Sequence, residues 1–178
     1  MQLQNYYYWF KDAIPHHVCD DIVRYAKSIQ DQMAVTGGLG NRKLNKKEVQ
    51  DLKKKRDSDI IWLNERWIYN AIHPYIHAAN RDANWNFQWD FSESCQFTKY
   101  KKGQYYDWHC DSWDKPYDSP NTPSHGKQRK LSVTLSLSDD KDYSGGELEF
   151  DMRNMDPDKK TNTHVLKEIR SKGSLVVF

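Results

Sequence analysis

The sequence lacks any long hydrophobic segment and contains little cysteine. No stretch approaches the roughly 18 consecutive apolar residues of a membrane-spanning helix. The N-terminus also lacks the basic segment and apolar run of a secretory signal. The three cysteines, Cys19, Cys95 and Cys110, are odd in number and show no C-x-x-C spacing, which argues against a disulfide framework or a zinc ribbon. We therefore expect a cytoplasmic protein that neither crosses a membrane nor is secreted.

An excess of charge of either sign is also missing. The chain has 27 Lys and Arg residues against 25 Asp and Glu residues, so its charge gives no reason to predict a nucleic-acid partner. Aromatic residues are plentiful, with seven Trp, eleven Tyr and six Phe, and their large apolar faces can build both a core and a binding groove. At 178 residues, the chain is expected to fold as one domain that buries roughly two-thirds of its unfolded surface.

Hydrophobic periodicity predicts helices and strands in the first half of the chain. Apolar residues from Ile14 to Ile29 recur at helical spacing, and Pro15 stands where a helix can begin without its N–H. Asn64 can cap a second helix. Residues 45–55 predict a short helix with a basic run, which is more typical of a solvated face than of a binding site. Strands are expected over residues 6–10, 58–63 and 85–91.

The most informative stretch ends at Asp111. It reads as a strand to Tyr100, a turn at Gly103 and a second strand that ends near His109. Residues i and i+2 of an extended segment point to the same face, so His109 and Asp111 can converge on one cation while Cys110 points away. Open iron(II) sites use two histidines and one carboxylate, which makes this pair a candidate for two of three ligands. A surface histidine beside a turn aspartate remains the alternative.

Further strands and loops follow this stretch. Residues 112–126 include three prolines and predict a long loop, a feature that often covers substrate when it lies at a metal site. Glycine turns are expected at Gly145-Gly146 and at Gly173. Strands are expected over residues 130–137, 147–150, 165–169 and 174–178.

The ordered set of motifs resembles the iron(II)- and 2-oxoglutarate-dependent oxygenases, specifically the prolyl 4-hydroxylase-like branch with bacterial and phage-encoded members. The matching order is Q-F-x-x-Y-x-x-G-x-x-Y-x-x-H-x-D over 96–111, a Leu/Ser/Thr strand, G-G-E-L-x-F over 145–150 and K-G-S-L-V-V-F over 172–178. The likeness runs from about Tyr6 to Phe178. It implies a mainly β fold with flanking helices, a double-stranded β-helix or jelly roll. The N-terminal helices and supporting strands would occupy about 1–92, and the jelly-roll core about 93–178.

The resemblance also implies roles for individual residues. His109 and Asp111 would bind Fe(II), and Tyr100 would line the pocket of 2-oxoglutarate. Trp108 and Trp113 flank the ligands and are candidates for groove walls, although Trp108 is more typical of core packing. In the family, an Arg-x-Ser element lies near the substrate entrance, and it matches Arg56-Asp-Ser58. The implied substrate contacts are therefore Arg56 and Ser58, with Trp113 as a candidate groove wall.

The implied activity is that of a dioxygenase that uses O2, with ascorbate as reductant. It would couple oxidative decarboxylation of 2-oxoglutarate to hydroxylation of an unactivated C–H bond. By analogy with the branch, the substrate is a prolyl residue of a peptide or protein. Two alternatives stay open, namely the same chemistry on a lysyl side chain or a small metabolite, and a catalytically inactive jelly-roll binding module. No oligomeric state is predicted.

The resemblance finally predicts that the ligand set is incomplete in this sequence. In the family, the strand that corresponds to 173–178 precedes a strand with the second iron-binding histidine, and then an arginine that pairs with 2-oxoglutarate. Both would lie beyond Phe178. His125 lies in the proline-rich loop, and His164 stands where the family has no ligand. We therefore expect a C-terminally truncated chain, with a jelly roll that lacks its last strands, and no activity of this chain alone.

Overall fold

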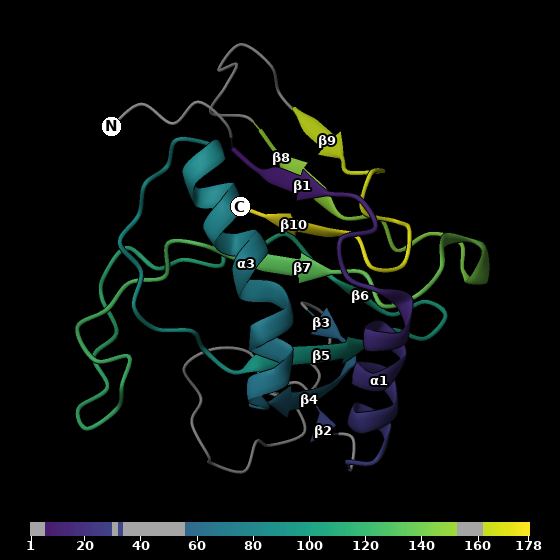
Figure 1. Ribbon diagram of the computed structural model, residues 1–178, viewed down its shortest axis with the longest axis horizontal. Helices are drawn as coiled ribbons and strands as arrows, with labels where there is room; N and C mark the ends of the chain where they lie inside the picture. The colour runs from purple at the N-terminus through teal and green to yellow at the C-terminus, as the bar shows by residue number, and fades with distance from the viewer. Residues whose placement is uncertain (1–5, 30–31, 34–55, 153–161) are drawn as a thin grey trace. The chain divides into compact units, whose positions relative to one another are not determined.

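The structure, a computed structural model, describes residues 6–29, 32–33, 56–152 and 162–178 (Figure 1). The chain divides into two compact units. The first unit draws on residues 1–23, 67–88 and 131–178, and the second on residues 24–66 and 89–130. Each unit therefore combines segments that are distant in the sequence. The short helix predicted over 45–55 and its basic run lie outside the described residues.

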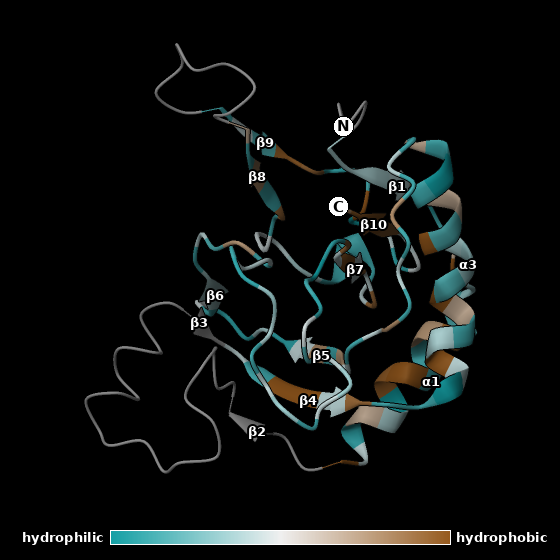
Figure 2. Ribbon diagram, turned by 90° about the vertical axis from the view of Figure 1, so that its left-hand side faces the viewer, coloured by the Kyte–Doolittle hydropathy of each residue, from teal (hydrophilic) through white to brown (hydrophobic). Residues whose placement is uncertain are grey.

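The first unit contains a three-stranded antiparallel sheet in the order β1-β10-β7. These strands span Tyr8–Phe10, Leu175–Val177 and Val133–Leu135. All three residues of the central strand β10 are buried, and Figure 2 shows this strand in the hydrophobic colour. The strands predicted near the two ends of the sequence are confirmed, and they pair with each other, with Tyr8 opposite Val177.

The first unit also contains a two-stranded antiparallel sheet, β8 (Glu149–Asp151) with β9 (Thr163–Val165). The strand β8 agrees with prediction, but the strand predicted over 165–169 is wrong. The extended segment ends at Val165, and residues 167–170 form a turn closed by a 3.2 Å hydrogen bond between main-chain groups. The apolar residues after Val165 therefore serve the core rather than a ladder.

An apolar cluster forms part of the core of this unit. Leu166 and Ile169 are buried there together with Val176 of β10. Burial of such aliphatic side chains is the main favourable contribution to folding. Partly buried residues pack against the cluster, namely Tyr7, Leu148, Phe150 and Phe178.

Two long helices confirm the predicted helical periodicity. They are α1 (His16–Lys27) and α3 (Arg66–Asp82). The carbonyl of Pro15 accepts hydrogen bonds of 2.9 and 3.2 Å from two N–H groups in the first turn of α1, so the proline begins the helix where its missing N–H costs nothing. Pro74 lies inside α3 without ending it. No helix in the described part of the chain is long and apolar enough to span a membrane.

Gly173 allows the segment before β10 to approach the start of α1 closely. The N–H of Ile14 donates a 2.9 Å hydrogen bond to the Gly173 carbonyl. The φ angle of Gly173 is +86°, and a Cβ atom there would lie 2.2 Å from the carbonyl oxygen of Ile14. Only glycine fits this position without a shift of the backbone.

The second unit contains two small antiparallel sheets. The first has the order β2-β4-β5, with strands at Gln32–Met33, Asp59–Leu63 and Cys95–Lys99. The second pairs β3 (Arg56–Asp57) with β6 (Tyr105–Tyr106). The strands predicted over 58–63 and before Tyr100 are thus confirmed. Three residues of β4 are buried, namely Ile60, Ile61 and Leu63.

The strand predicted over 85–91 is wrong, although its apolar and polar residues alternate. Asn84 and Asn86 adopt positive φ angles of 56° and 53°, which no strand accommodates. The side chain of Asn80 binds both main-chain groups of Phe87, accepting from its N–H at 2.9 Å and donating to its carbonyl at 2.8 Å. A side chain therefore takes the hydrogen bonds that a neighbouring strand would have made.

The described residues form two three-stranded and two two-stranded sheets. The protein is thus mainly β with few helices, as predicted. The strands are short, mostly of two or three residues. Their pattern alone does not establish a jelly roll.

Candidate metal centre

His109 and Asp111 lie in an irregular segment that follows β6 in the second unit. The ladder between β3 and β6 holds only two residue pairs and ends at Tyr106. The expectation that a strand continues to His109 is therefore wrong. The i, i+2 spacing still keeps His109 and Asp111 close together in the chain, but the β3–β6 ladder does not extend to them.

The two side chains converge despite the irregular backbone. The Nε2 atom of His109 lies 3.2 Å from Oδ1 of Asp111, and the two side chains are 36% and 33% exposed. For bonds of about 2.1 Å, neighbouring ligands of an octahedral cation stand roughly 3 Å apart. The spacing therefore fits two adjacent ligands of one small cation that solvent can reach.

The imidazole of His109 is oriented by its neighbours. Its Nδ1 atom lies 2.7 Å from the carbonyl oxygen of Asp107, which can only accept a hydrogen bond. In the neutral imidazole the proton therefore sits on Nδ1, and Nε2 presents its lone pair on the side of Asp111, as in metal-binding histidines. The ring also stacks on Tyr106, with centroids 3.6 Å apart and planes at 15°. These contacts fit the donor set of a metal site.

A third ligand is not supplied by the part of the chain that the structure describes. No group of three His, Cys, Asp or Glu side chains that could hold a metal ion occurs among these residues. His164 in β9 is engaged elsewhere, because the Tyr7 hydroxyl and its Nε2 atom are 2.9 Å apart. The described residues thus provide a ligand pair.

Sequence reasoning missed three groups around this pair. They are the Asp107 carbonyl, the Tyr106 ring and the guanidinium of Arg129, whose Nη1 atom donates a 2.6 Å hydrogen bond to the main-chain oxygen of Asp111. Tyr106 belongs to the motif and could have been suspected. Arg129 lies 18 residues after Asp111 in a polar segment, and nothing in the sequence pointed to it.

The predicted cosubstrate and substrate residues lie at several places in the second unit. Tyr100 follows β5 and is 48% exposed. The main chain of Arg56, in β3, pairs with Tyr106, which places Arg56 beside the strand that leads to His109. Ser58, between β3 and β4, is buried.

The tryptophans beside the ligand pair are both exposed. Trp108 is 56% exposed and Trp113 is 54% exposed, so the core-packing interpretation of Trp108 is wrong. The main-chain oxygen of Trp113 accepts a 2.7 Å hydrogen bond from Gln128, which fixes the backbone there. Large exposed aromatic faces are a common feature of binding surfaces.

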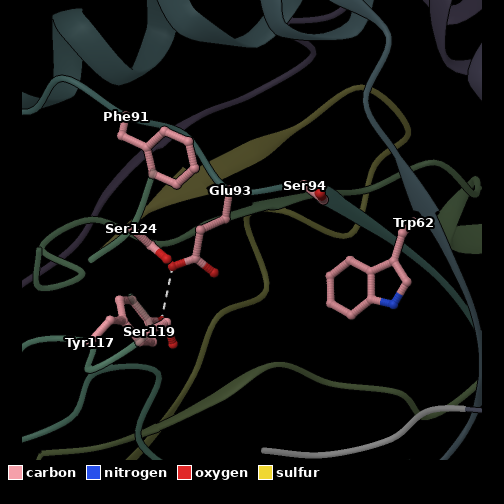
Figure 3. Close-up of a pocket in the computed structure, with 7 residues that line it drawn as sticks. All are labelled: Trp62, Phe91, Glu93, Ser94, Tyr117, Ser119 and Ser124. Atoms are coloured by element: carbon pink, nitrogen blue, oxygen red, sulfur yellow. Dashed lines mark hydrogen bonds between the residues drawn. The ribbon is translucent and has the colours of Figure 1, made fainter. Parts of the chain in front are cut away.

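An open pocket of about 430 Å³ lies in the same unit. Figure 3 shows its lining, in which the Tyr117 hydroxyl donates a 2.9 Å hydrogen bond to Glu93. Apolar walls with a few polar groups are typical of sites that bind organic ligands. Three aromatic side chains, one carboxylate and three serines line it, namely Trp62, Phe91, Tyr117, Glu93, Ser94, Ser119 and Ser124.

Comparison with known proteins gives matches of two kinds, one to a family model and one to solved structures. Residues 95–178 match the family model described as the 2OG-Fe(II) oxygenase superfamily, and this segment includes both candidate ligands. Among curated proteins, no sequence matches the chain. Among solved structures, the chain is similar to the viral collagen prolyl hydroxylase of Paramecium Bursaria Chlorella virus-1 in complex with 2OG. The TM-score is 0.61 at 19% identity, over 98% of this chain and 77% of that chain.

These matches bear on fold and family. The family and the structural neighbour imply the jelly-roll fold that the short strands alone do not establish. The description of the matched family names Fe(II) and 2-oxoglutarate, and its members are oxygenases. Residues 95–178 are thus similar to the 2OG-Fe(II) oxygenase superfamily, and the chain as a whole shares the fold of a viral collagen prolyl hydroxylase.

Proposed function

We propose that this protein is an Fe(II)- and 2-oxoglutarate-dependent dioxygenase that hydroxylates a prolyl residue of a peptide or protein. One observation carries the proposal. His109 Nε2 and Asp111 Oδ1 lie 3.2 Å apart, with the His109 proton directed to Asp107, inside the segment that matches the family model. This donor pair suits an iron(II) ion that keeps open positions for cosubstrate and oxygen.

In this proposal each site residue has a distinct task. His109 and Asp111 hold the iron, and the Asp111 carboxylate also offsets part of its charge. Tyr100 donates a hydrogen bond from its phenol to a carboxylate of 2-oxoglutarate. Iron, 2-oxoglutarate and O2 supply the oxidising chemistry when bound, with ascorbate as the reductant. The substrate-side residues are Arg56, Ser58 and Trp113, and the proposed compartment is the cytoplasm.

A peptide substrate is supported by two observations of different kinds. The structural neighbour is a collagen prolyl hydroxylase, which acts on a polypeptide. The pocket of Figure 3 has the aromatic walls of Trp62, Phe91 and Tyr117 beside serine hydroxyls. Aromatic-lined grooves with hydrogen-bonding groups suit extended, proline-containing peptides.

Metal binding tests the site directly. Co(II) can be titrated into the metal-free protein and followed by its visible absorption, for the wild type, His109→Ala and Asp111→Ala. The matched control is His125→Ala, since His125 lies in the loop over 112–126. We expect saturable Co(II) binding by the wild type and the control, and its loss in the other two variants. Undiminished binding by Asp111→Ala would remove this residue from the metal site.

Product analysis then tests the activity. The protein is incubated with Fe(II), 2-oxoglutarate and ascorbate, and succinate release is measured with and without a proline-containing peptide. A gain of one oxygen atom on a prolyl residue supports the proposal. The same gain on a lysyl side chain or a small metabolite would keep the chemistry and change the substrate. Metal binding without succinate would support the metal site and contradict dioxygenase activity of this chain.

A further inference from the structure

The main chain at Asp111 is held by contacts with Arg129 rather than by a strand ladder. The Arg129 Nη1 atom donates a 2.6 Å hydrogen bond to the Asp111 carbonyl. The Ser112 hydroxyl in turn donates to the Arg129 carbonyl at 3.2 Å. One residue therefore binds two consecutive residues of the segment, which restricts both the position and the direction of the backbone that carries the Asp111 carboxylate.

Arg129 is itself fixed by Glu93 through a two-pronged ion pair. Arg129 Nη2 lies 2.5 Å from Glu93 Oε2, and Arg129 Nε lies 3.3 Å from Glu93 Oε1. Two parallel contacts orient the planar guanidinium in a way that a single contact does not. Burial alone lowers the pKa of Arg129, but the hydrogen bond and the charge of Glu93 outweigh it and hold the pKa above its ordinary value. Arg129 therefore keeps its charge in this setting.

Tyr117 is the third member of this network, and it also binds Glu93. Its hydroxyl donates a 2.9 Å hydrogen bond to Glu93 Oε1 (Figure 3). Arg129 Nε contacts the same oxygen atom. The main chain of Tyr117 is anchored as well, because its N–H donates to the Lys127 carbonyl and its carbonyl accepts from the Gly126 N–H, both at 2.9 Å. The network thus ties Glu93 and Asp111 to the segment just before Arg129.

Arg129 hydrogen-bonds to the main chain of Asp111 and leaves the Asp111 carboxylate available to a metal ion. Arg129 contacts the main-chain oxygen of Asp111, while Oδ1 of the carboxylate lies toward His109. The guanidinium of Arg129 and the carboxylate of Asp111 carry opposite charges, so the two groups attract each other. Without Glu93, the guanidinium would lose its compensating charge, and the Asp111 carboxylate would become an alternative partner in competition with a metal ion.

We propose that the network of Glu93, Arg129 and Tyr117 is a positioning device that sets the Asp111 carboxylate for metal binding. This inference rests on the proposed function, since it takes Asp111 to be a metal ligand. Arg129 and Glu93 thus position a metal ligand, which an ordinary surface ion pair does not do. Such outer contacts typically change metal affinity by about 10-fold or more when they are removed.

The test compares two arginine–glutamate pairs of the same chain. Arg129→Lys keeps the charge but loses the planar fork, and Glu93→Gln loses the compensating charge. The matched control is Arg170→Lys, because Arg170 pairs with Glu147 at 2.9 Å with exposures of 27% and 39%, against 31% and 39% for Arg129 and Glu93. Two readouts are used on the full chain, namely Co(II) affinity and amide hydrogen exchange of residues 108–113 in the metal-free protein.

We expect Arg129→Lys and Glu93→Gln to bind Co(II) about 10-fold more weakly and to exchange residues 108–113 faster, with a smaller loss for Tyr117→Phe. Arg170→Lys should match the wild type in both readouts. Wild-type affinity and exchange in Arg129→Lys, in a protein whose Co(II) binding does require Asp111, would overturn the positioning role alone. Co(II) binding that is indifferent to Asp111→Ala would overturn the proposed metal site and the positioning role together.

Discussion

The imidazole of His109 lies almost parallel to the ring of Tyr106, with centroids 3.6 Å apart and planes at 15°. Tyr106 is the last residue of β6, and it pairs with Arg56 of β3. The stack therefore links the end of the β3–β6 ladder to the imidazole ring of His109, a candidate metal ligand. Together with the Asp107 carbonyl at Nδ1, it restricts both rotation and tilt of the imidazole.

Removal of this stack is expected to weaken metal binding without removing a ligand. Tyr106→Ala should raise the dissociation constant for Co(II) by about 2- to 10-fold, because an aromatic pair contributes about 0.5–1.5 kcal/mol beyond its buried area. Tyr106→Phe retains the ring and should bind like the wild type. Equal losses in both variants would show that the hydroxyl matters rather than the stack.

Tyr100 is expected to act on the cosubstrate and not on the metal. Tyr100→Phe should raise the apparent requirement for 2-oxoglutarate by about 1 kcal/mol, the usual contribution of one hydrogen bond. Co(II) affinity should stay unchanged. The measurement is a titration of succinate release, or of the Co(II) absorption, with 2-oxoglutarate. An unchanged titration would remove Tyr100 from the cosubstrate pocket.

Gly173 should tolerate no side chain. A Cβ atom would meet the Ile14 carbonyl oxygen at 2.2 Å, so Gly173→Ala is expected to lose about 2–4 kcal/mol of unfolding free energy, from overlap and from backbone strain together. Gly103→Ala is the matched control. Its φ angle of +80° is similar, but no atom lies within 4 Å of the added methyl, so only about 1 kcal/mol of strain is expected. Urea unfolding of both variants compares the two costs, and similar losses would contradict the close approach.

The Tyr25–Glu65 hydrogen bond predicts an acid-dependent part of the stability. The hydrogen bond from the Tyr25 hydroxyl is the largest influence on Glu65 and lowers its pKa. A carboxyl whose pKa is lower in the folded state stabilises the fold above its unfolded pKa, and this contribution is lost as the pH falls through the folded pKa. Tyr25→Phe should therefore reduce the difference in stability between pH 6 and pH 3. Unfolding curves at the two pH values measure this difference.

The same bond acts in the opposite direction on the tyrosine. The hydrogen bond to Glu65 raises the pKa of Tyr25, so the protonated phenol is favoured in the folded state. Its contribution is complete below the unfolded pKa and is lost as the pH rises through the folded value. Glu65→Gln should accordingly shift the ultraviolet titration of Tyr25 to lower pH. A titration that does not change would show that the bond is absent in solution.

Local patterns in the sequence predicted those elements whose formation depends on near neighbours. The helices at α1 and α3 follow from periodic apolar residues, and the strands β4 and β5 follow from short apolar runs bounded by turn residues. The convergence of His109 and Asp111 was also predicted from an i, i+2 spacing. The assumed reason was wrong, because β6 ends at Tyr106 and the two residues meet in an irregular segment.

The strand predictions failed where other contacts replaced pairing with a neighbouring strand. The alternation over 85–91 indicated a strand, but the Asn80 amide occupied both hydrogen-bonding groups of Phe87. The apolar residues after Val165 indicated another strand, but Leu166 and Ile169 were buried against Val176 instead. Periodicity reports which side chains are apolar, and it does not report which partner satisfies the backbone.

The sequence by itself determined the identity and order of the motifs, the candidate ligand pair and the family resemblance, because these depend on residue type and short spacing. Tertiary structure alone decided that β1 pairs with β10. It also decided that Arg129 binds Asp111 and that Glu93, 36 residues before Arg129 in the chain, orients the guanidinium. The physical reason is that such contacts require the chain to close loops whose geometry is set by all the packed segments together. A polar residue in a loop shows no sign of this role until the segments are brought together.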